Sequence, residues 1–199
     1  MINFALFSAL ATFYFTMFFT PGPNNAMLTA SGMKFGFIRT LPHLVGISLG
    51  HIFQIGLTCF GLTNIFLIYP QVQFFMKILC FLYLLFLGWK MIGSFSSIQK
   101  QTGRPLRFYE ASLFQFINPK AWSIAITVAS GFFPTEENIF IGVIFVTITA
   151  AIINLPTCSL WALFGSGLRK FVNNEKIKKL IEYMLAVLLV LTGLYILIK

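Results

Sequence analysis

The sequence predicts an all-α integral membrane protein of about six transmembrane helices. Of its 199 residues, 58% are hydrophobic and only 10% are charged, and the mean hydropathy is +0.87. Apolar runs of about 20 residues, long enough to cross a hydrocarbon core of roughly 30 Å, recur along the chain. These runs are continuous and rich in Leu, Ile and Phe, without the alternation of barrel strands, which excludes a transmembrane β-barrel.

Six apolar segments are expected to form these helices. They are Asn3 to Met33, Leu41 to Thr63, Val72 to Gly93, Ala111 to Phe133, Ile139 to Phe164 and Leu180 to Ile198. Because they fill almost the whole chain, we expect one membrane transport domain over residues 1–199, with halves at approximately 1–95 and 105–199. The first positive side chain is Lys34, so the amino terminus lacks the basic leader of a cleavable signal peptide. The first helix is therefore expected to stay in the mature protein.

The connections between these segments differ in charge, and this difference predicts the orientation of the bundle. The second connection, Asn64 to Gln71, has no charged side chain, and the fourth, around Pro134 to Asn138, has only two glutamates. The first, third and fifth connections are basic, through Lys34, Arg39, Lys90, Lys100, Arg104, Arg107, Arg169, Lys170, Lys176, Lys178 and Lys179. Basic loops stay inside, so both termini are predicted to lie outside the cytoplasm. The net charge of +9 is therefore better explained by topology than by a nucleic-acid or lipid-headgroup site.

Three helices in each half predict an unusual symmetry. Because three is odd, a second half that resembles the first would be inserted upside down, which is the inverted-repeat design of many secondary transporters. The loop around Ser96 to Arg107 is the only candidate joint between the halves.

The first expected helix contains the strongest local signal, the polar and Pro-rich run from Thr20 to Asn25. Two prolines and a glycine remove backbone donors and helical rigidity, so the helix should unwind or bend sharply there. Broken backbone survives in a bilayer only beside protein or a wet cavity. Asn24 and Asn25 can bind the freed backbone groups or a polar ligand. The alternative is a Pro-kinked packing helix or an early end to the span.

A matching signal, Asn118-Pro119-Lys120, interrupts the fourth expected helix. Each half therefore opens with a broken helix, and such a pair indicates a transport site at which the two breaks meet near one cavity. Two unrelated kinks are the alternative. Lys120 either extends to the inner interface along its methylenes or turns its ammonium toward a carboxylate-bearing substrate.

Polar residues in two further helices complete the candidate site. His51 lies near the predicted bilayer centre, where an ionisable side chain is a candidate for function and for proton coupling. A neutral histidine that only hydrogen-bonds between helices is the alternative. Asn154 precedes Pro156 in a polar kink, for which interhelical hydrogen bonding is the alternative. The candidate substrate-binding or pathway residues are Pro21, Gly22, Pro23, Asn24, Asn25, His51, Gln54, Asn118, Pro119, Lys120 and Asn154.

Several common chemistries have no residues to support them in this chain. There is no Asp, and the five Glu lie in connections or near segment ends, so no intramembrane carboxylate relay is available for protons. The sequence has no P-loop, nucleotide fingerprint, HExxH or Ser/His/Asp set, which argues against an ATP-driven pump and an enzyme. No cofactor is expected. Cys59, Cys80 and Cys158 are expected to be buried thiols and not metal ligands, because they lack the spacing of a metal site.

These features together resemble the lysine exporter (LysE/RhtB) family of bacterial amino-acid exporters. The segments that carry the resemblance are Pro21-Gly22-Pro23-Asn24, Gly46 and Gly50, Tyr83-Leu84, Leu87-Gly88-Trp89-Lys90 and Asn118-Pro119-Lys120. Thr20 to Asn25 and Phe114-Gln115-Phe116-Ile117-Asn118 look most like the cysteine and O-acetylserine exporter branch. The resemblance implies a multi-pass exporter in the bacterial inner membrane that is driven by the proton motive force, and it allows a homodimer.

The expected cavity offers Lys120 and neutral amides but no buried carboxylate. A zwitterionic or neutral amino-acid-like substrate is therefore expected in preference to lysine or another cation. The scarcity of acidic and clustered Cys or His ligands also disfavours a metal exporter. Other classes remain as alternatives: an exporter of another small solute or metal ion, a membrane enzyme that acts on lipid substrates, and a structural subunit. An enzyme should show converging acid, base or metal-binding residues, and a structural subunit should not need paired broken helices.

Overall fold

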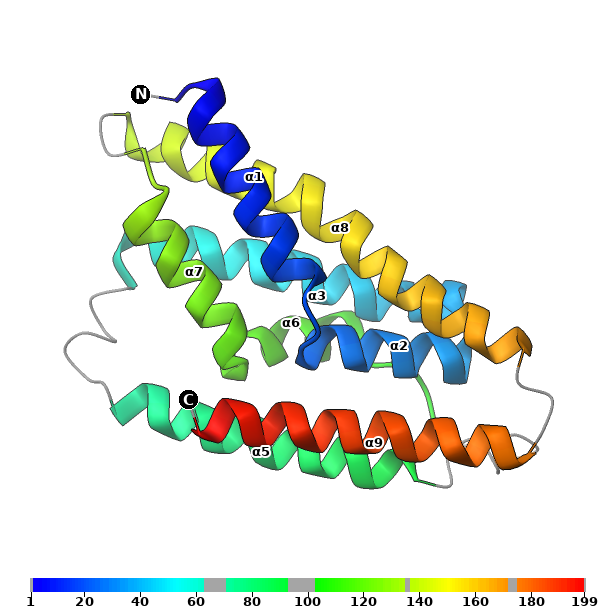
Figure 1. Cartoon of the computed structure of the whole chain (residues 1–199). Coiled ribbons are helices and arrows are strands. Elements are labelled where there is room, and N and C mark those ends of the chain that lie inside the picture. Colours follow the sequence, from blue (N-terminus) through cyan, green and yellow to red (C-terminus); the bar gives the residue numbers. More distant parts are fainter. Residues whose placement is uncertain (1, 63–70, 93–102, 135–136, 172–174, 199) are drawn as a thin grey trace.

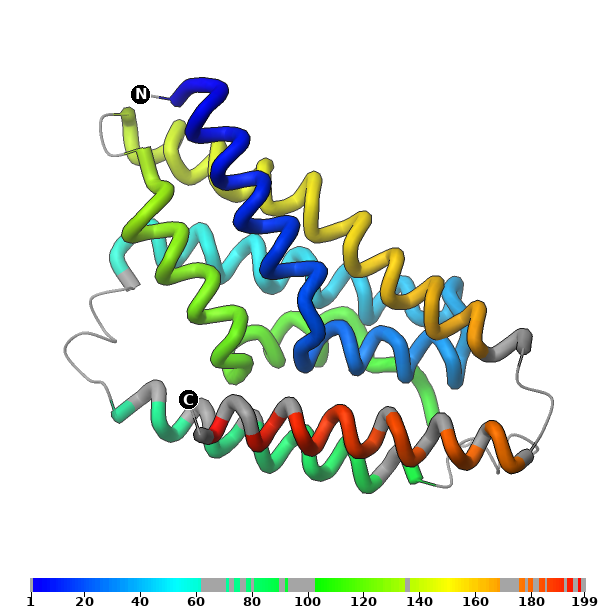
Figure 2. The backbone as a smooth tube through the Cα atoms, in the orientation of Figure 1, coloured from blue at the N-terminus to red at the C-terminus, as the bar shows by residue number. Residues whose placement is uncertain are grey.

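The computed structural model describes residues 2–62, 71–92, 103–134, 137–171 and 175–198, and all regular structure in these ranges is helical. The helices are shown in Figures 1 and 2. They are α1 (Phe4–Phe19), α2 (Pro23–Phe35), α3 (Phe37–Leu57), the π-helical turn η1 (Thr58–Leu62), α5 (Gln71–Met91), α6 (Phe108–Ile117), α7 (Pro119–Gly131), α8 (Ile139–Phe171) and α9 (Glu175–Ile198). The expected all-α class is confirmed.

Some sequence expectations lie outside the described residues. These are the expected connection at 63–70, most of the expected joint at 93–102, Glu136, and the side chains of Cys80, Lys90, Arg169, Lys170 and Lys178. Two of the three cysteines are described, and both are free: Cys158 is buried and Cys59 is half-buried.

The two interruptions predicted from proline chemistry are present. Helix α1 ends before Thr20 and α2 begins at Pro23, and the two axes are bent by 55°. Helix α6 ends at Asn118, whose backbone is extended, and α7 begins with Pro119. Each proline occupies the first turn of the second helix, where its missing N–H costs nothing and its fixed φ favours the helix.

The fifth expected segment is one helix that is longer than predicted. Helix α8 continues through Pro156 and ends at Phe171, seven residues beyond the expected end at Phe164. The polar side chains around Pro156 bond within their own helix: the Thr157 hydroxyl donates to the Ile153 carbonyl at 2.7 Å. A single proline removes only one helical donor, so the helical bonds on either side of Pro156 can continue the helix.

The outer faces of the helices are suited to lipid. Large apolar side chains such as Phe53, Ile144 and Ile152 are more than half exposed. Within the described residues, two helices are long and apolar enough to cross a membrane, at Phe37–Gly61 and Ile139–Leu168. The bent pair α1 and α2 makes a third if it is counted as one span. An exposed apolar surface of this extent is expected of helices that face hydrocarbon.

The helices have two distinct ends in Figure 1. The junction of α2 and α3, the start of α6, the end of α8 and the start of α9 lie toward the right. We call this the basic end, because it carries Lys34, Arg39, Arg104 and Arg107. The starts of α1 and α8 and the end of α7 lie toward the left, at the opposite end. Helices α5 and α9 run antiparallel, in contact along the lower side of the view.

An apolar core closes the opposite end of the bundle. Helices α1, α3, α7 and α8 meet there through Leu10, Tyr14, Ile55, Val128 and Val146, all of which are fully buried. Burial of such side chains contributes about 1.5–3 kcal/mol each. This core leaves the polar residues of the same helices to gather nearer the middle of the bundle.

Glycines bring two pairs of helices into backbone contact. A Cβ atom at Gly32 would overlap the Ala162 carbonyl, and one at Gly165 would overlap the Thr29 carbonyl, so α2 and α8 touch directly. On α3, a Cβ at Gly50 would lie 2.6 Å from the Ser112 Cα atom of α6. Gly46 meets α6 in the same way, and the four-residue spacing of these two glycines puts both on one close-packed face of α3.

Candidate functional site

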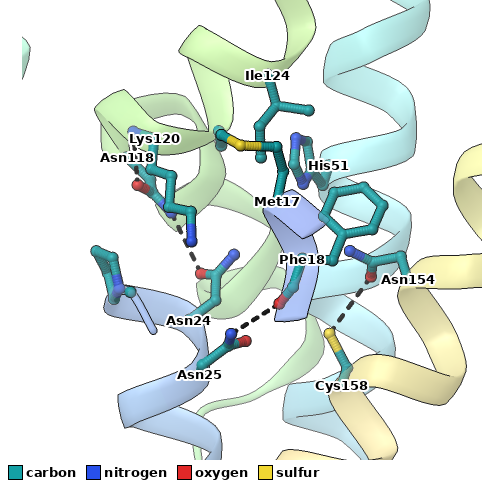
Figure 3. Close-up of a pocket in the computed structure, with 13 residues that line it drawn as sticks. Met17, Phe18, Asn24, Asn25, His51, Asn118, Lys120, Ile124, Asn154 and Cys158 are labelled. Carbon is teal, nitrogen blue, oxygen red and sulfur yellow. Dashed lines mark hydrogen bonds between the residues drawn. The ribbon is translucent and has the colours of Figure 1, made fainter. Parts of the chain in front are cut away.

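Both breaks face one small cavity in the middle of the bundle (Figure 3). Residues from the α1–α2 break, α3, the start of α7 and α8 surround it. The lining residues are Met17, Phe18, Gly22, Pro23, Asn24, Asn25, His51, Asn118, Lys120, Ala121, Ile124, Asn154 and Cys158. Of the eleven candidates from the sequence, Pro21, Gln54 and Pro119 do not line this cavity.

Lys120 joins the two breaks directly. Its ammonium donates to the Thr20 carbonyl at 2.9 Å, to the Thr20 hydroxyl at 2.9 Å and to the Pro21 carbonyl at 3.3 Å. These oxygens lie at the carboxyl end of α1, where unpaired carbonyls carry partial negative charge. The lysine of the second break thus neutralises the first break. All three N–H donors of the ammonium are used within the protein. Lys120 therefore neither extends to the inner interface nor points to a substrate, which were the two positions expected from the sequence.

Asn25 repairs the first break from inside its own segment. Its side-chain amide donates to the Phe18 carbonyl at 2.7 Å and to the Thr20 carbonyl at 2.8 Å. Both carbonyls lose their helical donors because α1 stops. Asn25 is only 5% exposed, so without these bonds the Phe18 carbonyl would be left without a donor in the interior and the Thr20 carbonyl would keep only Lys120. Its role in this structure is therefore to satisfy backbone groups.

An amide cluster connects the two broken helices on the side of the cavity nearer the basic end. Asn24 and Gln115 exchange two hydrogen bonds, at 2.8 and 3.2 Å, and the Asn118 amide lies 3.4 Å from the Asn24 oxygen. The Asn118 oxygen also accepts from the Lys120 backbone N–H at 3.1 Å and thereby caps α7. Gln115 is fully buried and was not among the candidates. The signal in the sequence that could have identified Gln115 is its position three residues before the break at Asn118.

His51 is the cavity's unpaired polar side chain. It is 2% exposed, and its ring meets the Phe18 ring edge to face, with centroids 5.3 Å apart. Neither ring nitrogen has a hydrogen-bond partner of good geometry among the described residues, although the Ala121 backbone lies nearby. The expected alternative, a histidine satisfied between helices, is therefore not found. A buried imidazole without a partner is costly unless a ligand, water or proton uses it.

Two other polar candidates bond elsewhere. Gln54 donates to the Gln115 backbone carbonyl at 3.1 Å, so it links α3 to α6 beside the cavity. Asn154 lines the cavity and accepts a hydrogen bond from the Cys158 thiol at 3.4 Å. Met17, Phe18 and Ile124 supply the apolar side of the lining. Apolar residues in an apolar helix carry no distinguishing signal, so sequence reasoning did not identify them.

The size of the cavity determines what it can hold in this structure. Its volume is about 30 Å³, and one water needs about 10–15 Å³ by a comparable measure. The cavity therefore has room for one or two waters but not for an amino acid. An amino acid could therefore be accommodated only if the surrounding helices moved.

A family model described as "LysE type translocator" matches residues 15–199. The cysteine/O-acetylserine efflux protein of Salmonella paratyphi A is 30% identical over 161 residues, which cover 80% of this chain and 82% of that protein. The protein of the same name from Escherichia coli is 28% identical over the same coverage. No solved structure matches the chain.

Proposed function

The chain belongs to the LysE type translocator family, and we therefore propose that it exports small amino acids or close derivatives from a bacterial cytoplasm. It is a transporter and not an enzyme. The observation that carries the proposal is the meeting of two broken helices at one polar cavity. Unwound backbone at membrane depth is tolerated where it lines such a site, and transporters bind substrate at these breaks.

We propose that the chain crosses the inner membrane six times as two inverted repeats. The repeats would be α1 to α5 and α6 to α9, with α3 corresponding to α8. The pattern of helix contacts supports this symmetry. Helix α3 of the first repeat packs on α6 and α7, and α8 of the second repeat packs on the corresponding helices α1 and α2. The basic end would face the cytoplasm, which leaves both termini outside. A homodimer, allowed by the family resemblance, can be tested by light scattering in detergent.

The proposed substrate is a small zwitterionic amino acid. The cavity lining contains an ammonium, four asparagines and a histidine but no carboxylate, which disfavours a cationic substrate. The names of the two relatives support cysteine, O-acetylserine or a compound of similar size and charge. Both are neutral overall and carry one carboxylate that an amide or ammonium donor can bind.

Flux measurements test this function. Inside-out vesicles that contain the protein should take up labelled cysteine or O-acetylserine faster than vesicles without it. Thr127→Ala is the control variant, because Thr127 is exposed on α7 and its hydroxyl bonds only within that helix. Movement of another solute class, with no amino acid or close derivative transported, would disprove the proposal.

We also propose that the proton motive force drives export and that His51 carries the proton. An imidazole changes charge near physiological pH, and neither ring nitrogen of His51 has a hydrogen-bond partner of good geometry among the described residues. In the variant His51→Gln, exchange of substrate for substrate should persist while uptake driven by a proton gradient is lost. Gradient dependence equal to that of the wild type would remove His51 as the coupling residue.

A further inference from the structure

A second and much larger cavity lies at the basic end of the bundle. Its volume is about 340 Å³, compared with about 30 Å³ for the central cavity. Helices α2, α3, α5 and α9 surround it together with the segment that leads into α6. The residues that matter for its chemistry are Ser31, Lys34, His43, Arg104 and Glu110. This cavity is large enough for a small amino acid, whereas the central one is not.

The Asn24–Gln115 amide pair lies between the two cavities. On α2, Asn24 lines the central cavity and Met27, less than one turn later, lines the larger one. On α6, Glu110 lines the larger cavity, and Gln115 follows it by five residues. Beyond the central cavity, the apolar core around Tyr14 closes the opposite end. A solute that arrives from the basic end therefore meets the larger cavity first.

The charges in this cavity favour a carboxylate. Glu110 is held by Arg104 through two bonds of 2.6 Å and by the Arg107 backbone N–H at 2.7 Å, so its oxygens are already engaged. Lys34 and Arg104 bring two positive charges against this single negative charge. The turn at Gly103, where φ is +121°, passes close to the Lys34 ammonium. A Cβ atom built on Gly103 would lie 3.9 Å from the Lys34 Nζ atom.

The remaining walls suit a short and mostly apolar side chain. Met27, Leu87, Leu106 and Leu189 line the cavity from four different parts of the chain. His43 belongs to the inner wall, is 2% exposed, and neither ring nitrogen has a hydrogen-bond partner among the described residues. A buried imidazole that lacks a partner at the edge of a cavity is a group that a polar ligand can satisfy.

We propose that this cavity is a loading site, at which Lys34 and Arg104 bind the carboxylate of a zwitterionic amino acid before the Asn24–Gln115 pair opens. The inference rests on the proposed function for the identity of the solute. The loading site determines how tightly the protein binds substrate from the basic end, whereas the central cavity determines how fast the bound substrate crosses.

Lys34→Gln separates this site from the central cavity. The variant removes one charge-assisted contact, so KM for O-acetyl-L-serine presented at the basic end should rise about tenfold while the maximal rate stays within about twofold. Lys179→Gln is the matched control, because Lys179 is an exposed lysine of α9 that does not line the cavity. Lys34→Arg should restore the wild-type KM, because the positive charge returns.

Direct binding distinguishes failure of the loading site from failure of the proposed function. Purified wild-type protein should bind labelled O-acetyl-L-serine, and Lys34→Gln should weaken that binding about tenfold. The amide analogue, which lacks the carboxylate, should compete poorly with the wild type. Transport with a KM and binding unchanged by Lys34→Gln would overturn the loading site and leave the exporter intact. Carboxylate-dependent binding that Lys34→Gln weakens, without any transport, would support the loading site and overturn the exporter function.

Discussion

The two breaks at the central cavity are built differently. The first runs from Thr20 to Gly22, and its freed carbonyls are satisfied by Asn25 and, from the other half of the chain, by Lys120. The second is the single residue Asn118, which caps the helix that follows with its own side chain. The first break therefore depends on a partner more than ninety residues away, whereas the second is largely self-sufficient.

This difference teaches that related breaks need not contribute equally to a site. A longer break frees more carbonyls at a helix end, and a cation there is favoured by the helix dipole. Loss of that cation should affect both breaks at once. Loss of a local cap should affect only one. Three substitutions at the breaks test this asymmetry, from the largest expected effect to the smallest, and a fourth at the start of α6 is expected to have the least effect.

Lys120→Met should have the largest effect. It removes three charge-assisted contacts to Thr20 and Pro21, leaves the Pro21 carbonyl without this donor and leaves the Thr20 carbonyl with Asn25 alone, so transport should fall by about a hundredfold or more. Initial flux at matched protein levels measures this. The control is Ser123→Ala, one turn later on the exposed face of α7, whose hydroxyl bonds only to the Pro119 carbonyl. A wild-type rate in Lys120→Met would show that the first break does not depend on the second half.

Asn25→Leu should have the next largest effect, mainly on stability. Leucine has a similar size but donates no hydrogen bond, so the carbonyls of Phe18 and Thr20 lose their nearest donor. The expected loss in free energy of unfolding is about 1–3 kcal/mol, because the Phe18 carbonyl is left unpaired while Lys120 still donates to the Thr20 carbonyl. Thermal unfolding in detergent measures it. A loss below about 1 kcal/mol would mean that the break is not held from inside its own segment.

Asn118→Ala should destabilise the protein less than Asn25→Leu. It removes the cap of α7 and a long 3.4 Å contact to Asn24, so the expected loss is about 1 kcal/mol. Asn3→Ala is the reference, because the Asn3 side-chain oxygen caps the exposed start of α1 by accepting a hydrogen bond from the Leu6 N–H. The comparison of the breaks would reverse if Asn118→Ala were less stable than Asn25→Leu.

Glu110→Gln should have the smallest effect and should depend on pH. The hydrogen bonds from Arg104 and from the Arg107 backbone lower the pKa of Glu110 from 4.5 to about 2. Its contribution to stability is therefore present above pH 4.5 and is lost as pH falls toward 2. The Tm of the variant should lie below that of the wild type by a few degrees at most at pH 7, because the ion pair is exposed.

The pH series supplies the control for this last prediction. The difference in Tm between Glu110→Gln and the wild type should shrink steadily between pH 5 and pH 3. The difference in Tm between Asn3→Ala and the wild type should not change over this range. A difference that stayed constant with pH would show that the carboxylate charge does not stabilise the start of α6.

The two breaks could be predicted from the sequence because their causes are local. Proline and glycine limit the backbone wherever they occur, so Pro21 to Pro23 and Pro119 identified both interruptions to within a residue or two. The contacts of Lys120 could not be predicted, because a long flexible side chain can reach an interface, a ligand or a helix end. Only the packing of the two halves determines which of these it meets.

Other residues required the tertiary structure for the same reason. Gln115 and His43 are ordinary polar residues in sequence, and their importance depends on which helix faces them. Pro156 carried a strong local signal, yet α8 passes through it without a break. Two prolines around a glycine interrupt a helix, whereas the single proline within α8 is accommodated.

The glycine contacts have a mechanical consequence for how the central cavity could open. Gly32 and Gly165 join α2 to α8, and Gly46 and Gly50 join α3 to α6, so each tight pair takes one helix from each half of the sequence. The halves are interlocked and cannot rock past each other as separate blocks. We expect the moving bodies to be the two helix pairs, with the Asn24–Gln115 contact as the joint that separates when one pair turns against the other. Spin labels on α2 and α8 should keep their spacing through the transport cycle, while labels on α2 and α6 should move apart.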